Sequence, residues 1–97
     1  MTEAKAEHKI NIAIDEGVSQ GRYSNLVMLY SNATEFVVDF AILQPQQPLA
    51  RIHSRIILNP VQAKRLGQML SDQIHHYEQT LGPIRQTDPK GSVNSLQ

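Results

Sequence analysis

Hydrophobic and polar positions alternate through most of the chain between His8 and Leu58. A period of two is typical of β-strands that bury one face. Segments rich in glycine, proline, serine or asparagine divide the pattern into four runs. We therefore predict four strands, at His8–Asp15, Arg22–Ser31, Thr34–Leu43 and Leu49–Leu58.

The breaks between the runs predict how the strands connect. Only Ser31-Asn32-Ala33 separates the second run from the third, and asparagine readily adopts turn geometry, so these two strands should form a hairpin. Pro45 and Pro48 lie between the third and fourth runs, where neither can join a central ladder. The pattern thus predicts an antiparallel sheet in which the first strand lies at either edge.

The hydrophobic spacing changes to steps of three to five after the fourth run. Asn59 fits a helix N-cap, Pro60 the first helical position, and Gln62 the partner of a capping box. Gly82 followed by Pro83 fits the helix end. We predict one amphipathic helix of about 22 residues, roughly 33 Å long. Its apolar stripe comprises Val61, Leu66, Met69, Leu70, Ile74, Tyr77 and Leu81.

These elements predict an α+β fold with the order β-β-β-β-α, a four-stranded antiparallel sheet followed by one long C-terminal helix. Residues 10–82 should form a single domain. Residues 1–9 and 83–97 are polar and aperiodic, typical of a flexible N-terminus and a disordered tail. A domain of about 60 residues buries only about 60% of its unfolded surface. A monomer of this size would be marginally stable, so we expect self-association.

Composition narrows the function classes. Lys and Arg together number 9, as do Asp and Glu, so the net charge of zero argues against a general nucleic-acid binder. The chain has no cysteine, which excludes a disulfide framework and a thiolate zinc site. Met1–Lys9 lacks the apolar run of a signal peptide, and no stretch approaches the ~20 apolar residues of a membrane span. These features predict a cytoplasmic protein that does not enter the membrane.

Candidate catalytic or metal-binding sets are weak. His75 and His76 are adjacent and project about 100° apart on a helix, and Asp72 supplies at most a second ligand. No glycine-flanked serine elbow and no phosphate-binding loop is present in the sequence. We therefore predict no enzyme activity, no cofactor and no metal. An enzyme would require a closed pocket that combines His53 with Asp39.

The second and third strands carry apolar residues on both faces. One helix covers only one face, and an exposed antiparallel face should be polar. We therefore predict that a partner subunit, most simply a second copy related by a two-fold axis, covers the other face. The favoured function is a non-enzymatic protein-binding or assembly module. The candidate residues for the self-interface, or for a groove that receives another polypeptide, are Leu26, Met28, Tyr30 and Val37.

The basic residues support an alternative function. Asp39 on the third strand could pair with Arg51 or Arg55 on the fourth, which would set the register. If the basic side chains instead gather on one surface, the protein would bind nucleic acid or another anion with strong salt dependence. The candidates for that patch are Arg51, His53, Arg55, Lys64 and Arg65.

The order of several short motifs resembles a family of small prokaryotic proteins known only as a domain of unknown function. The motifs are Tyr23-Ser24-Asn25, Glu35-Phe36-Val37-Val38-Asp39-Phe40, Arg55-Ile56-Ile57-Leu58-Asn59-Pro60, Ala63-Lys64-Arg65-Leu66 and Tyr77-Glu78 with Gly82. The resemblance covers about residues 10 to 82 and implies no activity. Antiparallel strands followed by a long helix are also similar to the SecB export chaperone family, which implies oligomers and a polypeptide partner.

Overall fold

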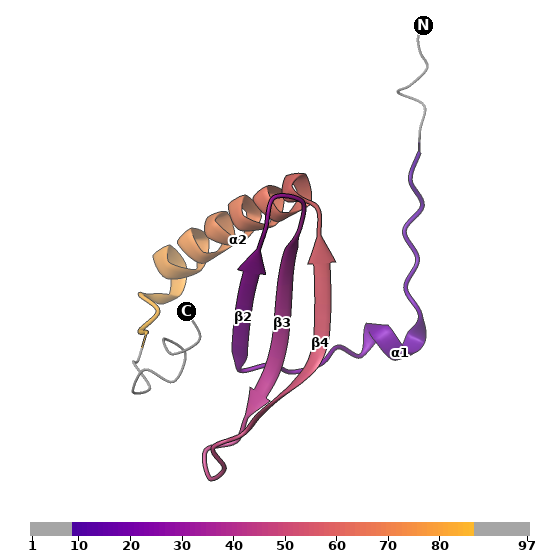
Figure 1. Cartoon of the computed structure of the whole chain (residues 1–97). Coiled ribbons are helices and arrows are strands. Elements are labelled where there is room, and N and C mark those ends of the chain that lie inside the picture. The colour runs from indigo at the N-terminus through magenta and orange to yellow at the C-terminus, as the bar shows by residue number, and fades with distance from the viewer. Residues whose placement is uncertain (1–8, 87–97) are drawn as a thin grey trace, which may run out of the picture.

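The computed structural model describes residues 9–86 and has an α+β fold (Figure 1). Strands β2 (Leu26–Ser31), β3 (Phe36–Leu43) and β4 (Ala50–Leu58) form an antiparallel sheet in the order β2-β3-β4. A short helix, α1 (Glu16–Ser19), precedes the sheet, and the long helix α2 (Pro60–Leu81) follows it. The predicted fold class and long C-terminal helix are confirmed. The predictions for residues 1–8 and 87–97 lie outside the described residues.

The first of the four predicted strands, at His8–Asp15, is not present in the described part of the chain, so the sheet has three strands. Residues 9–14 have no regular secondary structure, and the segment runs away from the sheet on the β4 side (Figure 1). Ile10, Ile12 and Ile14 are 83%, 91% and 64% exposed. Alternation favours an extended backbone, but a strand also needs a neighbouring strand that takes up its N–H and C=O groups. The single chain places no such neighbour beside this segment.

The hairpin between β2 and β3 is confirmed, and an asparagine holds its turn. The Asn32 N–H donates to the Glu35 carbonyl at 3.0 Å. The Asn32 side-chain oxygen accepts from the backbone N–H groups of Thr34 and Glu35, at 2.9 and 3.0 Å. Tyr30 pairs with Val37 next to the turn. This local bonding explains why so few residues suffice to reverse the chain.

The helix begins and ends where the sequence predicts. The Asn59 side chain accepts a hydrogen bond from the Gln62 N–H at 2.7 Å, and Pro60 occupies the first turn. At the other end Gly82 has φ 102°, a conformation that glycine adopts without steric cost, and its N–H donates to the Glu78 carbonyl at 3.0 Å. Both caps satisfy backbone groups that the helix itself leaves without partners.

One irregularity interrupts the pairing of β3 with β4. Phe40 lies opposite Ser54, whereas the next residue, Ala41, lies opposite Ile52, so His53 is an extra residue in β4. Such a bulge shifts the alternation of the strand by one position. Arg51 and Arg55 therefore project from opposite faces of the sheet. Strict alternation along Leu49–Leu58 predicts Arg51, His53 and Arg55 on one face, and this prediction is wrong because alternation alone does not reveal the extra residue.

The two faces of the sheet differ in what they carry. We call the side toward α2 the helix face and the opposite side the outer face. The register places on the helix face Val27, Leu29, Phe36, Val38, Phe40, Ile56 and Leu58. It places on the outer face Leu26, Met28, Tyr30, Val37, Asp39, Arg55 and Ile57.

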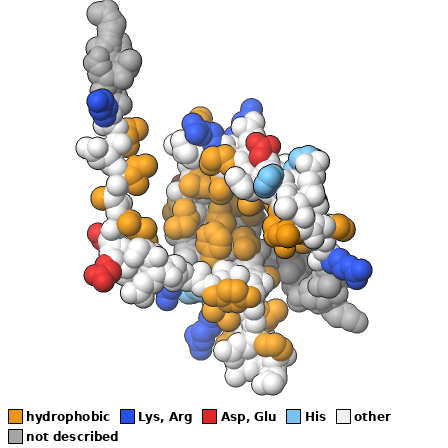
Figure 2. Space-filling view, turned by 180° about the vertical axis from the view of Figure 1, so that it is seen from behind, with side chains coloured by type: hydrophobic (Ala, Val, Ile, Leu, Met, Phe, Trp, Pro, Cys, Tyr) orange, Lys and Arg blue, Asp and Glu red, His pale blue; other side chains and the backbone are white. Residues whose placement is uncertain are grey.

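The core of the described chain is small. Val38 and Ala41 are its only buried apolar residues, and no residue of α2 is buried. The helix thus lies over the sheet without closing on it, contrary to the expectation that its stripe covers one face completely. Figure 2 shows the resulting exposed hydrophobic side chains, which gather over the sheet beside α2.

Candidate interaction surfaces

A groove of about 490 Å³ separates α2 from the helix face of the sheet. Its walls are almost entirely apolar, and Lys64 is the only charged residue among those that line it. Leu29, on the floor of the groove, is 63% exposed. The residues that line the groove are Val27, Leu29, Phe36, Val38, Leu58, Pro60, Ala63, Lys64, Leu66, Gly67 and Leu70.

Two small residues help to keep the groove open. Ala63 and Gly67 lie one turn apart on the side of α2 that faces the sheet. A Cβ atom added at Gly67 would meet no heavy atom within 4 Å, so the single chain leaves that space unfilled. Two residues of the predicted helix stripe, Leu66 and Leu70, line this groove, but the hydrophobic pattern did not predict the groove itself. Ala63 and Gly67, on the same side of the helix as Leu66 and Leu70, are the signal that indicates it.

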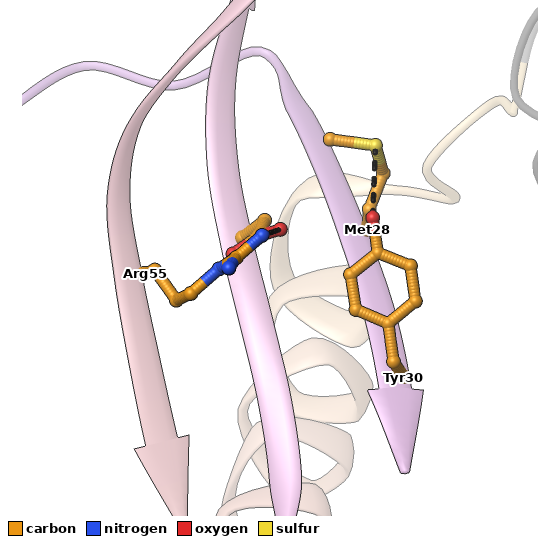
Figure 3. A network of polar contacts seen from close by, with 4 residues as sticks. Met28, Tyr30 and Arg55 are labelled. Atoms are coloured by element: carbon orange, nitrogen blue, oxygen red, sulfur yellow. Dashed lines mark hydrogen bonds and ion pairs between the residues drawn. The ribbon is translucent and has the colours of Figure 1, made fainter.

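The outer face is organised around one ion pair. Arg55 donates from Nε to Asp39 Oδ1 at 2.7 Å and from a terminal nitrogen to Oδ2 at 2.8 Å. Asp39 is completely inaccessible to solvent, whereas the Arg55 side chain is 58% exposed. Figure 3 shows this pair on the side of the sheet away from α2. Of the two arginines that the sequence offers to Asp39, the register selects Arg55, which lies directly opposite it in β4.

The ion pair shifts the pKa of both Asp39 and Arg55. The two hydrogen bonds from Arg55 hold the pKa of Asp39 below its ordinary value of 3.8, against the opposing effect of burial, with attraction to the guanidinium charge adding to the lowering. The same contacts raise the pKa of Arg55. Asp39 is therefore ionised at neutral pH and acts as a fixed acceptor rather than as a proton donor.

The four interface candidates predicted from sequence surround this pair. Leu26, Met28 and Val37 are half-buried, and Tyr30 is exposed. The Tyr30 hydroxyl lies 3.8 Å from the Met28 sulfur (Figure 3), a weak contact that folds the ring along the strand. These side chains shield Asp39 from solvent. Much of the apolar area on the outer face therefore already covers the Asp39 carboxylate of the same chain.

The basic residues do not form one patch. Arg51 and His53 line a pocket of about 410 Å³ together with Arg22 and Tyr23. Arg55 is bound to Asp39 on the outer face, and Lys64 lines the apolar groove on the other. Arg65, the remaining candidate, is an exposed residue of α2 and lines neither cavity.

His53 is engaged within the chain. Its Nε2 lies 2.9 Å from the Tyr23 carbonyl oxygen, which can only accept, so Nε2 carries the hydrogen. Its Nδ1 then accepts from the Ser54 hydroxyl at 2.8 Å. Arg22 donates to the His53 carbonyl at 3.3 Å. His53 therefore holds residues 22–23 against β4, and Asp39 lies with Arg55 rather than with this imidazole.

The described part of the chain offers neither a cluster of metal ligands nor a membrane-spanning helix. Between residues 9 and 86, no group of three or more histidine, aspartate or glutamate side chains is placed to hold a metal ion. Among the described helices, none combines the length and the apolar character needed to cross a bilayer.

Comparison with known proteins gives a family but no activity. The model of one family, described as "Protein of unknown function (DUF3467)", matches residues 1–86. No curated protein and no solved structure matches the chain significantly. The predicted resemblance to a family of unknown function is confirmed, whereas the similarity to SecB stays a prediction.

Proposed function

We propose that this chain, which belongs to the DUF3467 family of proteins of unknown function, is a non-enzymatic protein-binding module that assembles with itself. The observation that carries the proposal is the apolar groove between α2 and the helix face. A groove walled by Val27, Leu29, Leu66 and Leu70 suits apolar side chains of a polypeptide.

The small core supports the same proposal. Burial of apolar surface contributes roughly 25 cal/mol per Å², and among residues 9–86 the only buried apolar residues are Val38 and Ala41. Covering the groove removes further apolar area from water. Assembly would thus stabilise the fold as well as form the complex. In this respect the proposal resembles the predicted SecB-like oligomer.

The alternative, nucleic-acid or anion binding, gains no support from the geometry. Its five candidate residues lie on different surfaces, and one of them, Arg55, already neutralises Asp39. Phosphate binding needs several free cations along one surface. We therefore retain polypeptide binding as the proposed function.

The experiment that tests the proposal compares two substitutions of equal charge on α2. Leu70→Asp places a carboxylate in the groove, whereas Gln68→Asp places it on an exposed position that does not line the groove. We expect the wild type and Gln68→Asp to sediment as oligomers at micromolar concentration and Leu70→Asp to sediment as a monomer. Circular dichroism should show the same helix content in all three. A wild-type chain that sediments as a monomer would contradict the proposal.

A further inference from the structure

The segment at residues 9–14 has the pattern of a strand and lacks a neighbour. Ile10, Ile12 and Ile14 share one side of an extended backbone, while Lys9 and Asn11 share the other. In the described part of the chain, no hydrogen bond joins this segment to the sheet. Three exposed isoleucines in a row along one side are costly in water.

The edge of the sheet at β2 lacks the usual protection against strand addition. Natural edge strands carry charges, prolines or bulges that prevent pairing with another chain. The sequence of β2, Leu-Val-Met-Leu-Tyr-Ser, contains neither a charge nor a proline. The opposite edge, β4, carries Arg51 and Arg55 and the bulge at His53. Of the two edges, β2 is therefore the one suited to receive a strand.

Helix α2 extends over the position that a strand beside β2 would occupy. Leu66 and Leu70 line the groove together with Val27 and Leu29 of β2. The helix itself continues past β2 (Figure 1). Three apolar residues of its later turns are exposed, and they are Ile74, Tyr77 and Leu81.

The dimensions of this overhang fit an added strand. Leu70 and Leu81 are about 16 Å apart along the helix axis, whereas neighbouring strands lie only about 4.8 Å apart. A fourth strand next to β2 would therefore lie beneath the uncovered stripe of the helix.

We propose that Ile10–Ile14 of a second copy of this chain adds to β2 as the fourth strand, with its three isoleucines facing α2. This inference rests on the proposed function, because it names the polypeptide that self-assembly supplies. Reciprocal exchange between two copies related by a two-fold axis satisfies both β2 edges and leaves a closed dimer. The predicted four-stranded sheet then exists in the dimer, with one strand from the partner.

The partner is a second copy because the segment of the same chain starts from the wrong edge. Arg22 donates to the His53 carbonyl, and the His53 imidazole donates to the Tyr23 carbonyl, so residues 22–23 are bound to β4. Residues 9–15 emerge beyond this point on the β4 side, whereas β2 is the opposite edge of the sheet (Figure 1).

Disulfide cross-linking tests the inference in a chain that has no cysteine of its own. Full-length Leu29→Cys with one tag is mixed with Ile10→Cys, Ile12→Cys or Ile14→Cys carrying a tag of different mass, and the mixture is unfolded, refolded and oxidised. We expect at least one isoleucine position to give the mixed disulfide species. The control Ala13→Cys, which projects from the other side of the strand, should not. Equal yields from Ala13→Cys and all three isoleucine positions would overturn the inference.

A second set of variants separates this inference from the proposed function. Replacing Ile10, Ile12 and Ile14 together with serine should reduce the sedimenting species to a monomer. Replacing Lys9, Asn11 and Ala13 with serine should leave it an oligomer. If the isoleucine variant stays oligomeric and no mixed disulfide forms, strand exchange is wrong although self-assembly through the groove stands. If the wild type itself sediments as a monomer, both fail.

Discussion

The outer face of the sheet keeps a charged residue out of contact with water, whereas the helix face leaves a groove between the sheet and the helix. On the outer face, side chains of three neighbouring strands enclose Asp39 so completely that it has no exposed surface, and Arg55 neutralises it. On the helix face, a 22-residue helix lies close by, yet a groove of about 490 Å³ remains. The charge on the outer face is thus fully covered, whereas apolar side chains on the helix face such as Leu29 stay exposed. Proximity of a helix does not by itself bury a face, and the helix face is the one for which we propose a partner.

The largest expected effect is on the oligomeric state, which should respond differently to a charge on each face. Leu29 and Met28 are adjacent in β2 and project from opposite faces. We expect Leu29→Asp to sediment as a monomer, because a carboxylate in the apolar groove would be desolvated by any partner. Met28→Asp should lower stability while the oligomer persists. If Met28→Asp dissociates the oligomer and Leu29→Asp does not, the interface lies on the outer face, where the sequence pattern predicted it.

The next effect concerns the charge on the outer face. Arg55→Met leaves the inaccessible carboxylate of Asp39 without its partner, so we expect a large loss of stability in urea unfolding at pH 7. The double variant Arg55→Met with Asp39→Asn removes the charge as well and should recover part of the loss. If the double variant is no more stable than Arg55→Met alone, the ion pair does not carry the stability of this face.

Acid provides a milder test of the same pair. Because Arg55 holds the pKa of Asp39 below its ordinary value of 3.8, the folded state binds this proton less readily than the unfolded state. The pair therefore contributes its full stability above about pH 4, and loses it as the pH falls through the folded-state pKa. We expect the melting temperature to fall in that acid range. In Asp39→Asn, that part of the pH dependence should disappear.

The smallest effect compares two valines of β3. Val38 is buried on the helix face, whereas its neighbour Val37 is half-buried on the outer face. Each buried CH₂ group is worth about 0.8 kcal/mol, and a cavity adds to the cost. We expect Val38→Ala to lower the free energy of unfolding by about 2 kcal/mol and Val37→Ala by about 1 kcal/mol. Equal values would mean that the faces contribute equally to the core.

Local signals account for the parts of the fold that were predictable. The Asn32 turn and the cap at Asn59 depend on residues within three positions of each other, and both are present. Whether the Ile10–Ile14 segment forms a strand depends on a neighbouring strand, and the alternation of its own residues does not specify that neighbour. The choice of Arg55 over Arg51 depends on the register, and the face of Arg51 depends on the bulge; both are properties of the pairing of two strands. The groove was missed because hydrophobic spacing records which side of a helix is apolar, and not how closely it packs.

Because His53 is an extra residue, β4 consists of two segments whose side chains alternate between the faces in opposite phase. Ala50–Ile52 and Ser54–Leu58 each alternate regularly, but the parity reverses between them. Deleting His53 would restore a uniform repeat and leave Ile52 and Arg51 opposite Ala41 and Ile42, on the faces that they already occupy. A strand of unchanged length without the bulge would instead turn Arg51 to the outer face, opposite Leu43. The extra residue thus sets the face of every side chain that precedes it in β4, so the residue count of this strand carries information that its composition does not.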